Sequence, residues 1–526
     1  MIFRSVADRP RSLRVMMWTR YCTPGQQYDI GGVVDMNVPR NQTSPMGIAI
    51  RQRVRANVLL IGCGPHAKRI YLQALAASEW ASLKAVVELE SKRPQTMATI
   101  GKMFNGVEFV FTQQSGNRSD LPEELRHELA LIVHRGQINS VIVATEPLSH
   151  MSYALWAQSC GLHVLIDKPI STYEDVATPP AQAAKLMADY ELLSARRDPA
   201  KAFIVNTQRR YHPGFQYVFE EVTAVAREYG VPVTAMQSTH SDGQWRLPAE
   251  IVTQDYHPYN SGYGKVSHSG YHILDVMSNF IDRSFSASGK SFDEVGAFAA
   301  FITPEGLIHQ QNRKDHLAIF GERYGQLNPL TDDELKLRYT GYGEVDASAL
   351  ITLFNSRTPV SNLTVNLLHN SFSRRNWLHP GKDLYKGNGR VKHEYHSIQQ
   401  GPFQNIQIHS YQAHDKHDGE QPADHREIGG NNHFDVHVFR NAGVLGGEPL
   451  RTLSSGDFHF TPAGGGTGLM IEQVKHQVVH EFVSIVRGER APDTSESDLA
   501  THRLSVQLMS LTYQAGATRR ELRCAR

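Results

Sequence analysis

The chain has 526 residues, of which 40% are hydrophobic and 20% are charged, a composition typical of a globular protein. Its 54 basic and 53 acidic residues leave a formal net charge of +1, which argues against nucleic acid or an anionic membrane as a partner recruited by bulk charge. Nothing approaches the run of about 18 apolar residues that a membrane span needs. Four scattered cysteines without a C-x-x-C pair favour a reducing compartment, so we expect a cytoplasmic location.

The first clear structural unit begins near residue 54. Residues 1–53 show no sustained period and are predicted to form an irregular leader. Residues 56–61 form a short apolar run that predicts a strand buried on both faces. Apolar residues at helical spacing then follow a glycine-containing segment. That segment is Gly62-Cys63-Gly64-Pro65-His66-Ala67.

The order of strand, G-x-G-x-x-A and helix predicts a dinucleotide-binding turn. Gly62 permits the tight turn, Gly64 lets a pyrophosphate approach the backbone, and Ala67 lets the helix pack closely on the strand. Pro65 suits an early helical position, where no N–H is needed. With His66 it lies at a helix N-terminus, whose free N–H groups favour phosphates.

A second predicted strand, residues 83–87, ends at Glu88. An acidic residue about 25 positions after the first glycine is placed to bind a ribose 2′-hydroxyl, which favours NAD. Lys92 and Arg93 follow closely and suit a 2′-phosphate, so NADP stays open.

Further apolar runs alternate with helical patterns, which predicts an α/β fold whose parallel sheet is covered on both faces. Helices are expected at residues 149–160 and 181–195. Ligands of such sheets bind beyond the carboxyl ends of the strands. Strands are expected at residues 107–111, 140–144, 163–166 and 202–205, and the residues at strand ends are Gly62, Glu88, Thr145 and Lys168.

Two of these strand ends carry motifs that resemble the glucose–fructose oxidoreductase/inositol dehydrogenase/MocA (Gfo/Idh/MocA) family. The chain has A-T-E-P at residues 144–147 and Asp-Lys-Pro at residues 167–169, where the family has A-T-P-P-like and Glu-Lys-Pro sequences. The resemblance resumes in several later segments, which are residues 208–213, 264–275, 346–354 and about 474–515. Residues 373–468 interrupt it, and their polar, Gly-rich composition predicts an exposed elaboration serving as a lid or oligomer contact.

The resemblance implies a Rossmann domain, residues 54–207, that binds NAD or NADP. It implies a C-terminal α/β domain, residues 208–515, with a mostly antiparallel open sheet, followed by a tail, residues 516–526. Such sheets often pack face to face, so a homodimer or homotetramer is expected. The cofactor-binding residues that the resemblance adds are Thr145, Glu146, Pro147, His150, Asp167, Lys168 and Arg209.

The resemblance also implies catalytic residues. The family's D-x-G-x-H motif matches residues 268–272, so His272 and Lys168 match the catalytic histidine and lysine. Imidazole suits removal of a hydroxyl proton, and a lysine stabilises developing alkoxide charge. His268 stands where the family has aspartate, and both a supporting catalytic role and a structural role stay open. Arg210, His212 and Asp275 are expected near the substrate, with Arg209 and Arg210 suited to a carboxylate or phosphate or to a solvated turn.

The expected function is hydride transfer between NAD(P) and a secondary alcohol of a sugar, cyclitol or related polyol. Two alternatives stay open, an NAD-dependent glycoside hydrolase of the same fold and a non-catalytic dinucleotide-binding protein. His414 and His417, flanked by Asp415 and Asp418, resemble a metal site. Since no cysteine or helical spacing supports them, no metal is predicted.

Overall fold

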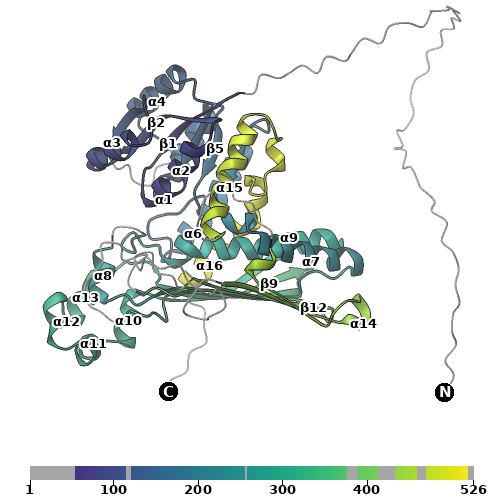
Figure 1. The fold of residues 1–526 in the computed structure, drawn as a ribbon. Helices are drawn as coiled ribbons and strands as arrows, with labels where there is room; N and C mark the ends of the chain where they lie inside the picture. The colour runs from purple at the N-terminus through teal and green to yellow at the C-terminus, as the bar shows by residue number, and fades with distance from the viewer. Residues whose placement is uncertain are drawn as a thin grey trace, which may run out of the picture. The chain divides into compact units, whose positions relative to one another are not determined.

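Two sheets, each packed against helices, make up the described part of the chain (Figure 1). The first has six strands and the second has eight. The expected leader, residues 1–53, lies outside the described residues. The computed structural model describes residues 54–113, 120–254, 257–375, 389–412, 433–458 and 470–518.

The first sheet is parallel throughout, with strands in the order β3-β2-β1-β4-β5-β6. Each strand predicted from the sequence overlaps one of these. The strand order reverses between β1 and β4, which makes the topological switch point where α/β sheets bind ligands. The strands are β1 (Ala56–Ile61), β2 (Ala81–Leu89), β3 (Glu108–Thr112), β4 (Ser140–Val143), β5 (His163–Ile166) and β6 (Phe203–Val205).

The central strand β1 is buried on both faces. Leu59 and Ile61 pack in one core cluster, whereas Val58 and Leu60 pack in another. A continuous apolar run is therefore what this position requires. The helices packed around this sheet are α1 (Pro65–Arg69), α2 (Tyr71–Ala77), α3 (Arg93–Gly101), α4 (Glu123–Arg135), α5 (His150–Ser159), α6 (Pro180–Ala195) and, from the far end of the sequence, α15 (Met470–Val486).

The second sheet has the order β14-β13-β12-β11-β7-β10-β9-β8. All neighbours are antiparallel except β7 and β10, which are parallel. The predicted fold class, a Rossmann domain with a mostly antiparallel second sheet, is therefore confirmed. The strands are β7 (Ala235–Gln244), β8 (Glu294–Ile302), β9 (Asp346–Asn355), β10 (Thr358–Asn370), β11 (Lys392–Gln400), β12 (Gln404–Gln412), β13 (His433–Arg440) and β14 (Leu450–Leu453).

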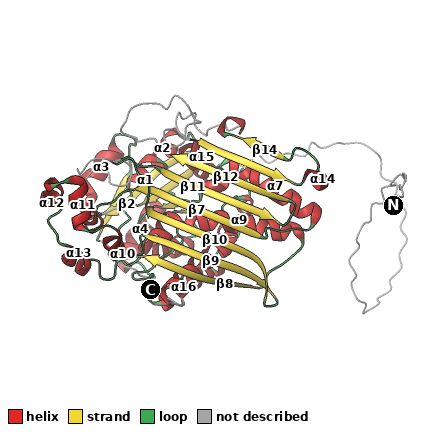
Figure 2. Cartoon of the chain, turned by 90° about the horizontal axis from the view of Figure 1, so that it is seen from below, coloured by secondary structure: helices red, strands yellow, loops and turns green. Residues whose placement is uncertain are grey.

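Long helices cover one face of this second sheet (Figure 1). They are α7 (Pro213–Tyr229), α9 (Tyr271–Ser288) and α16 (Arg503–Thr518). Figure 2 looks onto the opposite face, over which no described helix lies. No helix among the described residues combines the length and the apolar character that crossing a membrane requires. The short helices are α8 (Pro248–Val252), α10 (Pro304–Gln310), α11 (Arg313–Phe320), α12 (Glu322–Leu327), α13 (Asp332–Arg338) and α14 (Ala442–Leu445).

The segment 373–468, expected to be an exposed elaboration, instead supplies four strands of the second sheet. Among them, β11 pairs directly with β7 in the middle of the sheet. Ile398 and Ile408 are fully buried there. The polar composition was misleading because inward-facing positions at one end of β11 are charged or polar, namely Lys392, Glu394 and His396.

Substitutions in β12 test whether this segment belongs to the folded core. Ile408 is buried beneath the helices, whereas its neighbour Gln407 lies on the open face. We expect Ile408→Ala to lower the free energy of unfolding by about 2–5 kcal/mol, because it leaves a cavity. We expect Gln407→Ala to lower it by well under about 1 kcal/mol. Denaturant unfolding followed by circular dichroism measures both, and equal effects would contradict the assignment.

Candidate active site

The glycine turn has the backbone that a dinucleotide loop needs. Gly62 has φ = +89°, and a Cβ there would lie 2.6 Å from the carbonyl oxygen of Ala144, so no side chain fits. A Cβ on Gly64 would meet nothing within 4 Å, because Gly64 faces a cavity. Ala67 is buried in the core beneath the turn. The loop therefore leaves open space where a diphosphate would lie against the N-terminus of α1.

Glu88 at the end of β2 is tied to the glycine turn. Its Oε2 accepts a hydrogen bond of 2.7 Å from the backbone N–H of Cys63, and its Oε1 accepts one of 2.8 Å from Leu89. Of the two cations that follow, Lys92 lines the cavity. Arg93 does not, because its guanidinium binds Glu90 at 2.6 Å and covers the ring of Phe111.

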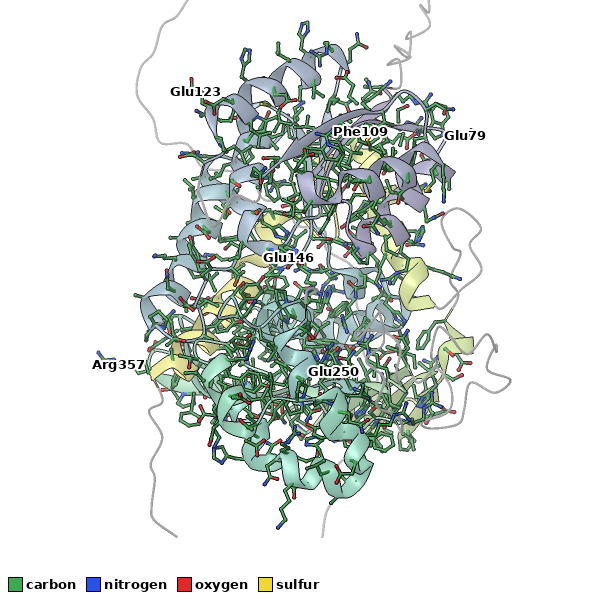
Figure 3. All side chains as sticks on the ribbon, turned by 90° about the vertical axis from the view of Figure 1, so that its left-hand side faces the viewer. Glu79, Phe109, Glu123, Glu146, Glu250 and Arg357 are labelled. Carbon is green, nitrogen blue, oxygen red and sulfur yellow. The ribbon has the colours of Figure 1, made fainter. Side chains whose placement is uncertain are left out.

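One cavity of about 670 Å³ joins the carboxyl edge of the first sheet to the covered face of the second. In Figure 3, Glu146 of this cavity lies between Phe109 of the first sheet and Glu250 of the second domain. Most of the residues predicted from the sequence line it. These are Gly62, Gly64, Pro65, His66, Glu88, Thr145, Glu146, Pro147, Asp167, Lys168, Arg209 and His272.

Several residues that line the cavity have a buried polar atom without a hydrogen-bond partner within the described part of the chain. These atoms are Oγ1 of Thr145, Oε2 of Glu146, Nη1 of Arg209, Nε2 of His240 and Nδ1 of His272. A buried polar group without a partner is costly. These atoms therefore fit a polar ligand such as a dinucleotide with a hydroxylated substrate.

Lys168 follows β5 and crosses to the second domain. Its Nζ donates a hydrogen bond to the main-chain carbonyl of His268. Burial lowers the pKa of Lys168 to about 8, and the carboxylates of Asp167 and Glu146 oppose that shift. Asp167 is itself held in place by Asn206, whose Nδ2 donates to it at 2.9 Å. The ammonium is thus fixed at the edge of the cavity.

His272 lies in the first turn of α9 and lines the same cavity as Lys168. Burial lowers the pKa of His272 well below its usual range, and the charges of Lys168 and Arg209 lower it further. The imidazole is therefore neutral at physiological pH and available as a proton acceptor.

The side chain of His268 does not line the cavity. It belongs to the π-helical turn Val266–Gly270, and its buried ring lies 4.7 Å from the ring of His257 and 5.3 Å from that of Tyr263. Only its carbonyl reaches Lys168. A supporting catalytic role of the His268 side chain stays a prediction.

Arg210, His212 and Asp275, expected near the substrate, do not line the cavity. Arg210 and Asp275 form a buried ion pair, with Nη2 at 2.6 Å from Oδ1, and His502 lies 3.2 Å from the same carboxylate. His212 caps α7 by accepting the N–H of Gly214. The sequence alone cannot reveal whether a charged residue faces a ligand or a buried partner on a distant element. The contacts of these three residues are structural ones.

Two other predicted residues make contacts that hold elements together. Arg209 lines the cavity, but its Nε donates at 2.6 Å to Oε1 of Glu394 in β11. His150 does not line the cavity. Its Nδ1 lies 2.8 Å from the carbonyl of Pro169 and its Nε2 lies 3.1 Å from that of Thr145. It therefore holds together the loops that follow β4 and β5.

The second sheet contributes cavity residues that sequence reasoning missed. They include His240 and Asp242 from β7, Ser269 from the π-helical turn, and Arg390 and Lys392 at the start of β11. The sequence feature that could have revealed them is that charged residues occupy alternate positions in β11. Strand pairing between residues 150 positions apart is needed to bring them together.

The proposed histidine–aspartate motif at residues 414–418 lies outside the described residues. In the part of the chain that is described, no group of three or more His, Cys, Asp or Glu side chains is arranged to hold a metal ion.

Comparison with known proteins agrees with this geometry. Residues 56–191 match the family described as "Oxidoreductase family, NAD-binding Rossmann fold" (GFO_IDH_MocA). Over these residues the chain thus matches an NAD-binding oxidoreductase family, and the resemblance noted in the sequence is confirmed. No curated protein sequence matched the chain.

Solved structures share the fold over nearly their whole length. Levoglucosan dehydrogenase in complex with NADH and levoglucosan is 14% identical with a TM-score of 0.51, over 88% of this chain and 98% of that one. An oxidoreductase from Agrobacterium radiobacter in complex with NAD+, L-tartaric acid and magnesium is 13% identical with a TM-score of 0.52, over 89% and 98%. At such identities the likeness concerns the fold.

A substitution in the glycine turn tests where the cofactor binds. Gly64→Val places a branched side chain in the open space beside α1, where no protein atom lies within 4 Å of the new Cβ. We expect the thermal midpoint to stay within a few degrees and NAD affinity to fall by at least roughly tenfold, about 1.4 kcal/mol. Calorimetric titration with NAD+ and NADP+ measures this. Unchanged affinity in the folded variant would contradict a diphosphate site at Gly64.

Proposed function

We propose that the protein is an NAD(P)-dependent dehydrogenase that oxidises a secondary alcohol of a sugar, cyclitol or related polyol. What supports the proposal is that Lys168 and His272 line the same cavity as the glycine turn. The two residues come from different domains, and one cavity holds an ammonium, a neutral imidazole and the loop of an NAD-binding family.

The chemistry divides between the cofactor and the chain. Bound NAD(P), held at the glycine turn of Gly62 and Gly64, would supply the hydride acceptor. His272 takes the hydroxyl proton at a ring nitrogen, which its depressed pKa leaves unprotonated. Lys168 donates a hydrogen bond to the same oxygen and stabilises its developing negative charge. Burial of both groups strengthens that interaction, because water screens it less.

Two residues that line the cavity, Glu88 and Lys92, bear on the preference between NAD and NADP in opposite directions. Glu88 disfavours a 2′-phosphate by charge, and this favours NAD. Lys92 is the residue in place to accept such a phosphate, since Arg93 is held by Glu90. Comparing the affinities of NAD+ and NADP+ decides between them.

One experiment separates this function from its alternatives. Purified protein is incubated with NAD+ or NADP+ and a panel of polyols, and absorbance of the reduced nicotinamide is followed. Net reduction of the cofactor supports a dehydrogenase. Cleavage of aryl glycosides without net reduction would instead indicate an NAD-dependent glycoside hydrolase, and cofactor binding without either reaction a non-catalytic protein.

Removal of the Lys168 ammonium is expected to lower turnover more than cofactor affinity. Lys168→Met should reduce kcat by about two to four orders of magnitude, since one group that stabilises transition-state charge contributes about 3–5 kcal/mol. In the wild type, kcat/KM should fall as pH rises through about 8, because the ammonium is then lost. A pH–rate profile flat to pH 10, or turnover retained in Lys168→Met, would contradict the role assigned here.

We also propose that the open face of the second sheet contacts a second copy of the chain. Phe298 and Leu350 lie opposite each other in β8 and β9, and are 42% and 46% exposed. A flat face that displays apolar side chains suits a symmetric sheet-to-sheet contact.

Mass measurement by light scattering tests this contact. We expect the wild type to be a dimer or tetramer at micromolar concentration and Leu350→Asp to dissociate it, because the contact would bury the new charge. Leu337→Asp is a matched control, since Leu337 is 78% exposed on α13. A monomeric wild type, or an oligomer indifferent to Leu350→Asp, would overturn the proposal.

A further inference from the structure

The second sheet contributes Arg390 and Lys392 to the cavity lining against one carboxylate, Asp242. Asp242 and Glu394 supply the carboxylates of β7 and β11, and both are buried. The cations that face them are Arg209, Lys265, Arg390 and Lys392.

Both carboxylates already have strong partners. Asp242 accepts from Lys265 at 2.5 Å, from Ser269 at 3.0 Å and from Arg390 at 3.0 Å. Glu394 accepts from Nε of Arg209 and lies 2.9 Å from Nε2 of His396. Although burial alone would raise the pKa of Glu394, Arg209 and His396 hold it well below its usual range. Neither carboxylate is left to neutralise a further cation.

Lys392 is the cation at this cavity that neither carboxylate neutralises. It begins β11, one inward-facing position before Glu394, and its side chain lines the cavity. Within the described residues, no hydrogen bond or ion pair engages its ammonium. Burial, together with the charge of Arg209, lowers the pKa of Lys392 to about 7. Lys392 is half-buried, and a cation partly removed from water without a counter-ion is unfavourable. The proton transfer assigned to Lys168 and His272 does not use it.

A second donor beside Lys392 also has no acceptor. Nη1 of Arg209 is buried on the cavity wall and has no hydrogen-bond partner among the described residues, while the rest of that guanidinium is held by Glu394. An ammonium and a fixed guanidinium N–H, on two residues that line one cavity, are suited to bind the oxygens of an anion.

Resting on the function proposed above, we propose that the substrate carries a carboxylate or phosphate group, which Lys392 and Nη1 of Arg209 bind. The substrate class is then a sugar acid or sugar phosphate rather than a neutral sugar. Binding the anion at the sheet would orient the remaining hydroxyl groups toward Lys168 and His272. Lys392 is a specificity-determining residue, because it contacts a part of the substrate that does not react.

Calorimetric titration tests the proposal without requiring turnover. Protein saturated with NADH is titrated with hexose aldonates and uronates, hexose phosphates, and the parent neutral sugars. We expect at least one anionic ligand to bind at least roughly tenfold more tightly than its neutral parent. Stronger binding of the carboxylates or of the phosphates identifies the natural group. If no anion binds more tightly than its neutral parent, the proposal is overturned.

Variants of Lys392 provide the matched comparison. Lys392→Met should weaken anion binding by about ten- to hundredfold and leave the thermal midpoint unchanged or raised, because it removes a half-buried charge that has no counter-ion. Lys392→Arg should retain part of the affinity. Lys314→Met, which removes an exposed charge on α11, should change nothing. Anion affinity unaffected by Lys392→Met would overturn the proposal.

The number of protons taken up on anion binding is a further measurement, and a purely structural lysine would not affect it. Because an anion favours the charged form of Lys392, binding near pH 8 should take up close to one proton, measured as a dependence of the binding heat on buffer. Lys392→Met should abolish that uptake. If anions bind through Lys392 but no ligand is oxidised, the anion site stands and the dehydrogenase fails. If neutral sugars are oxidised and Lys392 has no role, the dehydrogenase stands and the anion site fails.

Discussion

The buried ion pair between Arg209 and Glu394 is the interaction on which the site depends. Arg209 follows the last strand of the first sheet, and Glu394 lies in the central strand β11 of the second. Breaking one partner of such a pair costs about 3–5 kcal/mol, because the other charge stays buried. The pair fixes β11 against the nucleotide-binding domain. Because Glu394 is paired with Arg209, its carboxylate does not neutralise Lys392. One contact therefore sets both the geometry and the charge of the cavity.

The architecture was largely predictable because its signals are local. The apolar run of β1, the glycine turn and the acid that ends β2 each report on their own surroundings, and parallel strands bring their ends to one edge. Lys168 and His272 were also within reach of sequence reasoning, since family motifs mark them. The structure places both on one cavity.

What escaped sequence reasoning depends on long-range pairing. Lys392 and Asp242 are 150 positions apart, and only the antiparallel pairing of β7 and β11 brings them to one face. Arg210 and Asp275 look like ligand-binding groups in the sequence, yet each neutralises the other in the core. Charged residues at inward positions also disguised β11 as a loop, because a strand is normally recognised by its apolar alternation.

The hydrogen bond from Lys168 to the carbonyl of His268 bears on how this protein's sequence can diverge. Every residue type carries a main-chain carbonyl, so the contact places no demand on the side chain at position 268. The histidine at this position therefore leaves the anchor of the lysine intact, and a motif defined by side chains alone would not reveal this contact.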